Sequence, residues 1–259
     1  ATLANRLVGN AEGAAVLETT LRGPVLRFAA PATLALTGAE VEAVVDGRPV
    51  AMHSPFRVPL GGELQVGTAR RGLRTYVAVR GGIDVPLVFG SASADQLTGL
   101  GPAPLQAGDR LDLGAQALDA PAVDVAPVAA LEARAVLHVV PGPRDDWFAP
   151  DALTALLSGV FTVGAQVDRI GARMRGPSLP HRGDQELRSE GVARGSLQVP
   201  PSGDPILLLA DHPTTGGYPV IAVVTEADQS RAGQLRPGDE VRFRLRPGQP
   251  GVPRSEHFA

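Results

Sequence analysis

The sequence contains no cysteine and no lysine, since all 24 of its basic residues are arginine. Without cysteine the chain cannot form disulfides, thiolate nucleophiles or cysteine metal sites. Without lysine it cannot form a Schiff base, use a phosphate-loop lysine or carry biotin covalently. Any chemistry of this chain must therefore use other side chains.

Aromatic residues make up only 4% of the chain, which argues against a stacking platform for single-stranded nucleic acid. The net charge of −3 gives no electrostatic reason to expect nucleic acid or an anionic membrane as a partner. No apolar run approaches the roughly 20 residues that span a bilayer. Residues 1–20 also lack the basic start and apolar centre of a secretory signal. We therefore expect a cytoplasmic protein without nucleic-acid or membrane partners.

Strong catalytic and metal-binding motifs are also missing. The five histidines lack the spacing of a helical zinc site, and there is no GxSxG elbow or glycine-rich phosphate loop. We therefore expect no metal site. His53 and His138 lie in strand-like runs and are interpreted as histidines with satisfied hydrogen bonds, whereas His257 is assigned to the tail.

Short apolar runs separated by glycine, proline and aspartate dominate the chain from residue 14 onward, for example "TLALTG" and "RTYVAVRGG". This pattern predicts a mainly β fold, a barrel or sandwich, rather than βαβ units. Asp46-Gly47 between apolar flanks predicts a type I′ hairpin turn.

Few helices are predicted, and they are short. The start of the chain is typical of the end of a helix capped by Gly9 and Asn10, and its lack of an N-cap suggests a further segment upstream. A second helix is predicted near residues 150–158, with Gly159 at its end.

The two halves of the chain share a weak internal similarity. Each has an apolar strand that runs into a double glycine and, further on, a Gly-Asp turn that enters an alternating strand: "TYVAVRGGIDVP" with "AGDRLDL", and "LLLADHPTTGGYP" with "PGDEVRF". Duplication of one β-barrel unit explains this pattern, although so short a match also arises by chance. We predict units at 1–118 and 135–259, joined by an Ala- and Pro-rich connector at 119–134.

The stretch "PILLLADHPTTGGYPVIAVV", residues 205–224, carries the most unusual combination of residues. Its apolar run predicts a strand buried on both faces, and Pro213 ends the ladder directly after Asp211 and His212. The backbone can therefore become irregular, and Gly216-Gly217 permits positive φ and the close approach of a ligand. A capped turn without a ligand is the alternative interpretation.

Neighbouring segments supply further polar groups. The segment "QVDRIGARMRGP" carries Arg169, Arg173 and Arg175, which could clamp a carboxylate or phosphate, or could share one solvated strand face. Ser189, Glu190 and Gln198 precede a Pro-Pro-Ser-Gly turn, where a plain surface loop is the alternative. Because these segments flank one hairpin, the second half is the preferred site.

Long motifs along nearly the whole chain resemble the allophanate hydrolase subunit 2 family. They include "ANRLVGNAEGAAVLETTLRGP" and "VAVRGGIDVPLVFGSAS" in the first half, then "DRIGARMRGP", "SEGVARGSLQVPPSGDPILLLADHPTTGGYPVIAVV" and "AGQLRPGDEVRF". That family includes the C subunit of 5-oxoprolinase and the carboxyltransferase region of urea carboxylase. The resemblance implies two cyclophilin-like β-barrel units and a subunit 1/B-type partner.

Three functions follow from the resemblance. The first is a subunit of an ATP-dependent 5-oxoprolinase, which converts 5-oxoproline to glutamate. This subunit would be inactive without its partners, which include a third subunit, and the ATP site would not be formed by this chain alone. The second is a carboxyltransferase subunit of a biotin-dependent urea carboxylase, with biotin carried by another chain. The third is a non-catalytic antagonist that binds a kinase-inhibitor protein.

For the first function we expect Asp211 and His212 to supply polarity or proton transfer. The substrate-binding residues would be Arg169, Gln198, Thr214, Thr215, Gly216, Gly217 and Tyr218. Two departures from the family bear on this site. Relatives usually have some tens of residues before "ANRLVGN", and many have glutamine where this chain has Pro213.

Overall fold

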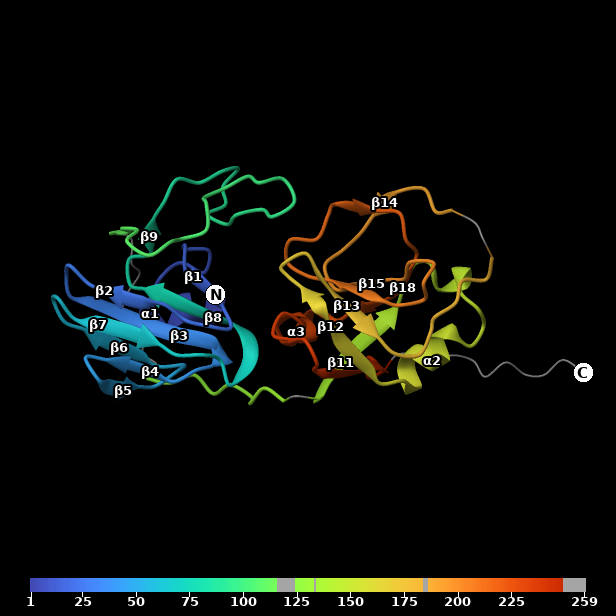
Figure 1. Cartoon of the computed structure of the whole chain (residues 1–259), viewed down its shortest axis with the longest axis horizontal. Coiled ribbons are helices and arrows are strands. Elements are labelled where there is room, and N and C mark those ends of the chain that lie inside the picture. The colour runs from blue at the N-terminus through green and yellow to red at the C-terminus, as the bar shows by residue number, and fades with distance from the viewer. Residues whose placement is uncertain (116–123, 133, 184–185, 249–259) are drawn as a thin grey trace, which may run out of the picture. The chain divides into compact units, whose positions relative to one another are not determined.

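The structure, a computed structural model, describes residues 1–115, 124–132, 134–183 and 186–248. The chain divides into two compact units, Ala1–Glu132 and Ala133–Ala259, each with its own sheets (Figure 1). Residues 119–123 and 133 of the predicted connector at 119–134 lie outside the described residues, as does His257. Of the helices in the described ranges, none has both the length and the apolarity needed to cross a bilayer.

The described residues of the first unit form one helix, two four-stranded antiparallel sheets and a two-stranded ribbon. The helix is α1 (Thr2–Val8). One sheet has the order β1 (Leu17–Thr20), β8 (Arg71–Val79), β3 (Ala32–Glu40), β6 (Pro55–Val58). The other has the order β2 (Val25–Arg27), β7 (Glu63–Val66), β4 (Ala43–Val45), β5 (Arg48–Val50), and the ribbon joins β9 (Ile83–Asp84) to β10 (Asp112–Leu113).

Successive side chains of β3 point alternately toward the second sheet and toward α1. Leu34 and Leu36 are fully buried against residues of the second sheet, in a cluster that also contains Leu64. Ala35, between them, faces the other way and packs with Leu7 of α1. Because successive strand residues point to opposite faces, this sheet is covered on both sides.

Two local predictions for the first unit are confirmed. Helix α1 ends at Gly9, which adopts the left-handed conformation with φ of 71°. The hairpin between β4 and β5 turns at Asp46 and Gly47, with φ values of 48° and 78°, as a type I′ turn requires.

The second unit is a closed barrel. Its strands follow the order β11 (Arg134–Pro141), β18 (Val220–Val224), β15 (Ser196–Gln198), β16 (Ile206–Leu208), β13 (Gly171–Arg175), β12 (Phe161–Val167), β19 (Glu240–Leu245). Outside the barrel wall are the ribbon β14 (Glu190–Gly191) with β17 (Thr215–Gly216), the 3₁₀ helix η1 (Asp145–Trp147), and the helices α2 (Ala152–Ser158) and α3 (Glu226–Ala232).

Alternating apolar residues fill the barrel. Phe161 and Phe243 meet edge to face with ring centroids 5.6 Å apart, and both are fully buried. Leu197 and Leu207 lie directly opposite each other on β15 and β16. Each fully buried side chain of this size contributes about 1.5–3 kcal/mol to the free energy of unfolding relative to an exposed one. The packed barrel therefore holds the ends of its loops in fixed positions.

The fold class is confirmed as mainly β with few short helices, since the α-helices of the described residues are three segments of seven residues each. The predicted helix near 150–158 is α2, followed by Gly159. The segments that suggested duplication differ in their pairing: "AGDRLDL" leads into β10 of a two-stranded ribbon, whereas "PGDEVRF" leads into β19 of the barrel.

Candidate active site

The bend after β16 folds into half of a two-stranded ribbon. Its strand β17 pairs with β14, so that Gly216 lies opposite Glu190 and Thr215 opposite Gly191. Figure 1 shows β14 apart from the barrel strands β15 and β18. The polar bend and the segment at 189–192 are therefore two sides of one structure, as their flanking positions in the sequence indicated.

Arg169 and Asp211 form a bidentate ion pair across this region. Arg169 Nε lies 2.6 Å from Asp211 Oδ2, and Nη2 lies 2.9 Å from Oδ1. The side chains are only 24% and 13% exposed. An ionised carboxylate held in this manner accepts hydrogen bonds and has no proton to donate. The contact favours a positioning role for Asp211 over proton transfer.

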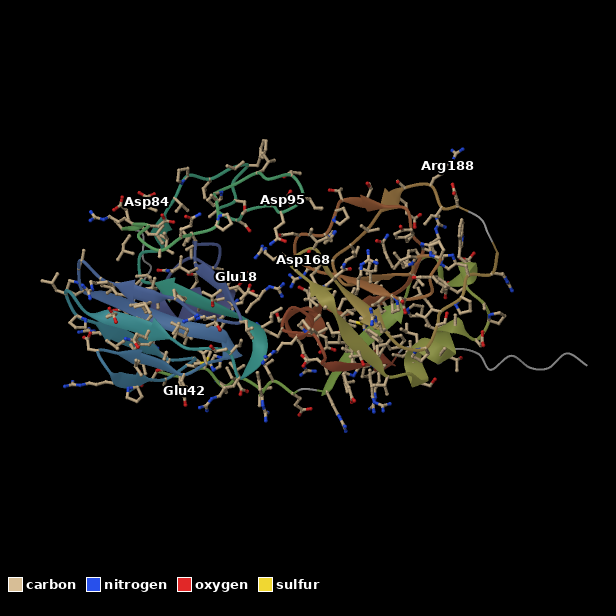
Figure 2. The ribbon with its side chains drawn as sticks, in the orientation of Figure 1. Glu18, Glu42, Asp84, Asp95, Asp168 and Arg188 are labelled. Carbon is tan, nitrogen blue, oxygen red and sulfur yellow. The ribbon has the colours of Figure 1, made fainter. Side chains whose placement is uncertain are left out.

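Backbone contacts fix the same pair of loops. The N–H of Asp211 donates to the Arg169 carbonyl at 2.8 Å. On the other loop Asp168 Oδ1 accepts from the N–H groups of Ile170 and Gly171 at 2.8 and 3.0 Å, which shapes the turn that carries Arg169. Figure 2 labels Asp168 at this turn. The loop conformation is therefore set by the chain itself.

His212 is held in one tautomer. Its Nδ1 lies 2.8 Å from the Pro213 carbonyl oxygen, which can only accept, so Nδ1 carries the hydrogen. In the neutral ring Nε2 is then the nitrogen with a lone pair. The side chain is half-buried. His212 thus presents a hydrogen-bond acceptor able to take a proton, which is what a general base requires.

Gln198 lies beneath the ribbon. It is 5% exposed, and its Nε2 donates to the Tyr218 carbonyl at 3.1 Å. A Cβ on Gly216 would collide with Gln198 Nε2. Neither Gly216 nor Gly217 has a positive φ, so the left-handed backbone that glycine permits is not adopted there. Glycine is needed at 216 because the Gln198 amide approaches so closely.

The other predicted substrate contacts lie on the outer side of the ribbon. Thr214, Thr215 and Gly217 are exposed, and Tyr218 is 44% exposed. The Thr214 carbonyl accepts from the N–H of Val192 at 3.1 Å. The backbone of this segment is therefore anchored while its hydroxyl groups and the tyrosine ring remain accessible.

An ion pair that sequence reasoning missed ties the ribbon down. Arg144, between β11 and η1, donates from Nη2 to Glu190 Oε2 at 2.7 Å and from Nε at 3.1 Å. Hydrogen bonding to Glu190, reinforced by its charge, raises the pKa of Arg144 above its ordinary value. The two residues lie 46 positions apart, so no local sequence signal predicts their contact.

The two histidines interpreted as satisfied differ in the structure. His138 Nδ1 lies 2.8 Å from Asp228 Oδ2, so that interpretation is confirmed. His53 Nε2 is buried without a hydrogen-bond partner among the described residues, so the interpretation was wrong there. His53 lies in a tight turn with φ of 58° rather than in a regular strand.

Comparison with known families places the chain among related proteins. The family described as "Carboxyltransferase domain, subdomain A and B" matches residues 1–245. The chain belongs to this carboxyltransferase domain family.

Relatives within the family carry the names that the sequence motifs predicted. The chain is 37% identical to the 5-oxoprolinase C subunit of Escherichia coli over 254 residues, which cover 93% of this chain and 78% of that protein. It is 34% identical to the 5-oxoprolinase C subunit of Haemophilus influenzae, with coverages of 92% and 77%. It is 33% identical to a putative urea carboxylase of Emericella nidulans, of which it covers 21%. The predicted resemblance is thus confirmed.

Solved structures share the fold of this carboxyltransferase-domain chain. The crystal structure of TTHA0988 matches with a TM-score of 0.86 and 40% identity over 94% of this chain, which spans about half (48%) of that chain. The Kluyveromyces lactis urea amidolyase matches with a TM-score of 0.86 and 28% identity, over 94% of this chain and 16% of that one.

The ribbon formed by β14 and β17 brings most of the predicted site residues together. Asp211 binds Arg169, and Gln198 supports Gly216 and the Tyr218 carbonyl. The arrangement offers a base nitrogen on His212 and the hydroxyl groups of the exposed Thr214 and Thr215 along one bend. Such groups can accept a proton and stabilise an oxyanion.

Proposed function

We propose that this chain is a subunit of an ATP-dependent 5-oxoprolinase, which opens 5-oxoproline to glutamate together with a subunit 1/B-type protein and a third subunit. The observation that carries the proposal is the similarity to two proteins named as the C subunit of 5-oxoprolinase, along both units of the chain. Their names describe a subunit, which supports a hydrolase that needs other chains.

The candidate site supports the chemistry of this reaction. Opening a lactam adds water across the C–N bond: the water oxygen bonds to the carbonyl carbon, and a proton reaches the ring nitrogen. His212 Nε2 would take the proton from water, since Nδ1 is engaged with Pro213. Hydroxyl and backbone donors of the 214–217 segment would stabilise the charge on the carbonyl oxygen.

Arg169, Asp211 and Gln198 would hold that segment in place rather than contact the substrate. Arg169 presents two nitrogens to Asp211, and Gln198 is 5% exposed. Pre-organised loops of this kind reduce the ordering that binding requires. In this proposal Arg169 therefore supports the bend and does not bind the substrate directly, as the sequence had predicted it would.

We assign ATP binding to a partner or to a surface completed by one. The chain has no lysine and no glycine-rich phosphate loop, so it lacks the usual groups that hold triphosphates. ATP is therefore a substrate of the assembly in this proposal.

A second function is favoured by the family description and by the urea carboxylase relative. In that reaction the same bend would bind urea, whose nitrogen would take the carboxyl group as the N–C bond of carboxybiotin breaks, while the proton lost from that nitrogen goes to biotin. Since this chain has no lysine, the biotin would be carried by another polypeptide. Both substrates are small amides, so a bend with oxyanion donors suits either.

Reconstitution with the partner subunits tests the proposal. We expect glutamate to form from 5-oxoproline only with ATP present, and His212→Asn to lower kcat by about 10²–10⁴-fold. Arg173→Gln, which changes an exposed arginine of β13, serves as the matched control and should leave kcat unchanged. Carboxylation of urea when a carboxybiotin-bearing carrier protein is added, with no turnover of 5-oxoproline, would favour the second function. Full activity of His212→Asn would rule out the assigned base.

A further inference from the structure

Three polar side chains of the first unit lie in one row across neighbouring strands. Thr33 of β3 is the direct cross-strand partner of Arg57 in β6. On the other side of β3, the N–H of Arg80, just after β8, donates to the Thr33 carbonyl at 2.8 Å. Directly opposite residues of antiparallel strands point to the same face, so Arg57, Thr33 and Arg80 share one face.

This face is the one that α1 covers. Ala35 and Ala78, each two positions from the row along its own strand, pack against Leu7 of the helix. Helix α1 ends at Val8, whose carbonyl accepts from Arg80 Nη1 at 2.8 Å. The row therefore lies just beyond the last turn of the helix, and Arg80 is fixed there by the end of α1.

A hollow of about 460 Å³ opens over the row. Among the described residues that line it, none is acidic; they are Pro31, Ala32, Thr33, Arg57, Val58, Pro59, Arg80 and Leu113. A site with mainly apolar walls and a few convergent polar groups is typical of small-molecule binding. Its volume falls within the usual range for such sites, about 300–1,000 Å³.

Charge in the hollow points to an anion. Arg57 has an exposed side chain and makes no ion pair with any residue in the described part of the chain. This is notable in a chain with 27 acidic and 24 basic residues. Arg80 adds a fixed positive charge and Thr33 a hydroxyl donor between the two arginines. Guanidinium groups bind carboxylate and phosphate oxygens in bidentate fashion.

We propose that this hollow binds a small organic anion, with its carboxylate or phosphate head against Arg57, Thr33 and Arg80. The apolar part of the ligand would pack on the proline and leucine side chains of the walls. All of these residues belong to the first unit, whereas the candidate active site belongs to the second. The inference goes beyond the proposed function and stands without it.

Calorimetric titration of the full chain, without partner subunits, tests the site. The probes are L-5-oxoproline, which joins a carboxylate to an apolar ring, and inorganic phosphate. We expect saturable binding of at least one probe, weakened about tenfold or more by Arg57→Gln, since a charged bidentate contact is lost. The carboxamide of 5-oxoproline, which has no charge, should bind correspondingly more weakly if the carboxylate is the head group.

Matched variants distinguish binding in this hollow from binding elsewhere on the chain. Arg48→Gln removes an exposed arginine of the other sheet in the same unit and should leave the affinity unchanged. Thr33→Val keeps the shape of the row and should weaken binding without loss of the folded circular dichroism spectrum. His212→Asn should leave phosphate binding unchanged, and 5-oxoproline binding that is lost in His212→Asn but kept in Arg57→Gln belongs to the proposed active site and not to the hollow. Absence of saturable binding by both probes, or equal affinity of wild type and Arg57→Gln, would overturn the proposal.

Discussion

Gly216 lies so close to the Gln198 amide that a Cβ on the glycine would collide with Nε2 and lie 3.2 Å from Cδ. Gln198 is buried at the end of β15 and cannot easily move away, because its amide donates to the Tyr218 carbonyl. The close approach of the Gln198 amide thus leaves no room for a side chain at position 216 of the ribbon.

Gly216→Ala should therefore displace the ribbon. We expect the free energy of unfolding to fall by about 1–3 kcal/mol, as for other overpacked sites, and turnover by the reconstituted assembly to fall as well. Gly191→Ala is the matched control, because it lies on the partner strand of the ribbon and a Cβ there meets nothing within 4 Å. Urea denaturation of both variants gives the comparison. Equal stability of the two would contradict the contact.

The Arg144–Glu190 ion pair should affect the ribbon's position more than overall stability. Both side chains are partly exposed, at 39% and 24%, and surface ion pairs of this kind stabilise folds little. We expect Arg144→Gln to raise the KM of the proposed reaction severalfold with a smaller change in kcat, since it loosens β14 against which β17 pairs.

Arg188→Gln is the control for this pair, because Arg188 is exposed and near the same strand (Figure 2). The melting temperatures of the two variants should agree closely. A KM for Arg144→Gln equal to that of the control would show that the ion pair does not position the bend.

Local features of the fold were predictable because each depends on a few adjacent residues. Gly9 after an apolar helical turn and Asp46-Gly47 between strands identify their structures directly. Helix α3 has end signals, with Thr225 before it and Gly233 after it, but its buried residues are Asp228 and Ala232, so it lacks an apolar stripe. Tertiary contacts through Asp228, which binds His138, give the helix its place.

In the candidate site, too, the local features were predictable and the tertiary contacts were not. The break after β16 was predictable from Pro213 and the glycines, and so was its irregular backbone. The partners of the polar groups were not, because Arg169 meets Asp211 across 42 positions of sequence. Sequence alone left Arg169 as a substrate clamp, whereas the folded chain turns it toward a carboxylate of its own.

Substitution of that pair tests its positioning role. Arg169→Lys keeps the charge but loses the fork that reaches both oxygens of Asp211. We expect a loss of about 2 kcal/mol in the free energy of unfolding, because the pair is largely buried, together with reduced turnover. Asp211→Asn should give a similar loss, and the double variant should lose less than the sum. Strict additivity of the two losses would contradict the coupling.

His53 should make the stability of the first unit depend on pH. Burial lowers the pKa of His53 below its ordinary value of 6.5, and the charge of Glu40 only partly opposes this. As the pH falls through the ordinary value, the unfolded chain binds a proton that the folded chain does not, so the free energy of unfolding falls. The full contribution is present above that value and is lost toward the lower pKa of the folded state. His53→Asn removes the titration, and asparagine tolerates the positive φ of this position.

Urea denaturation of wild type and His53→Asn at about pH 7.5 and about pH 5.5, on either side of the ordinary pKa of histidine, measures the effect. The wild-type protein should lose more stability between the two pH values than the variant. Contributions of the other histidines are common to both proteins and cancel in the difference. An equal loss in both proteins would mean that the buried ring of His53 accepts a proton as readily as it does in the unfolded chain.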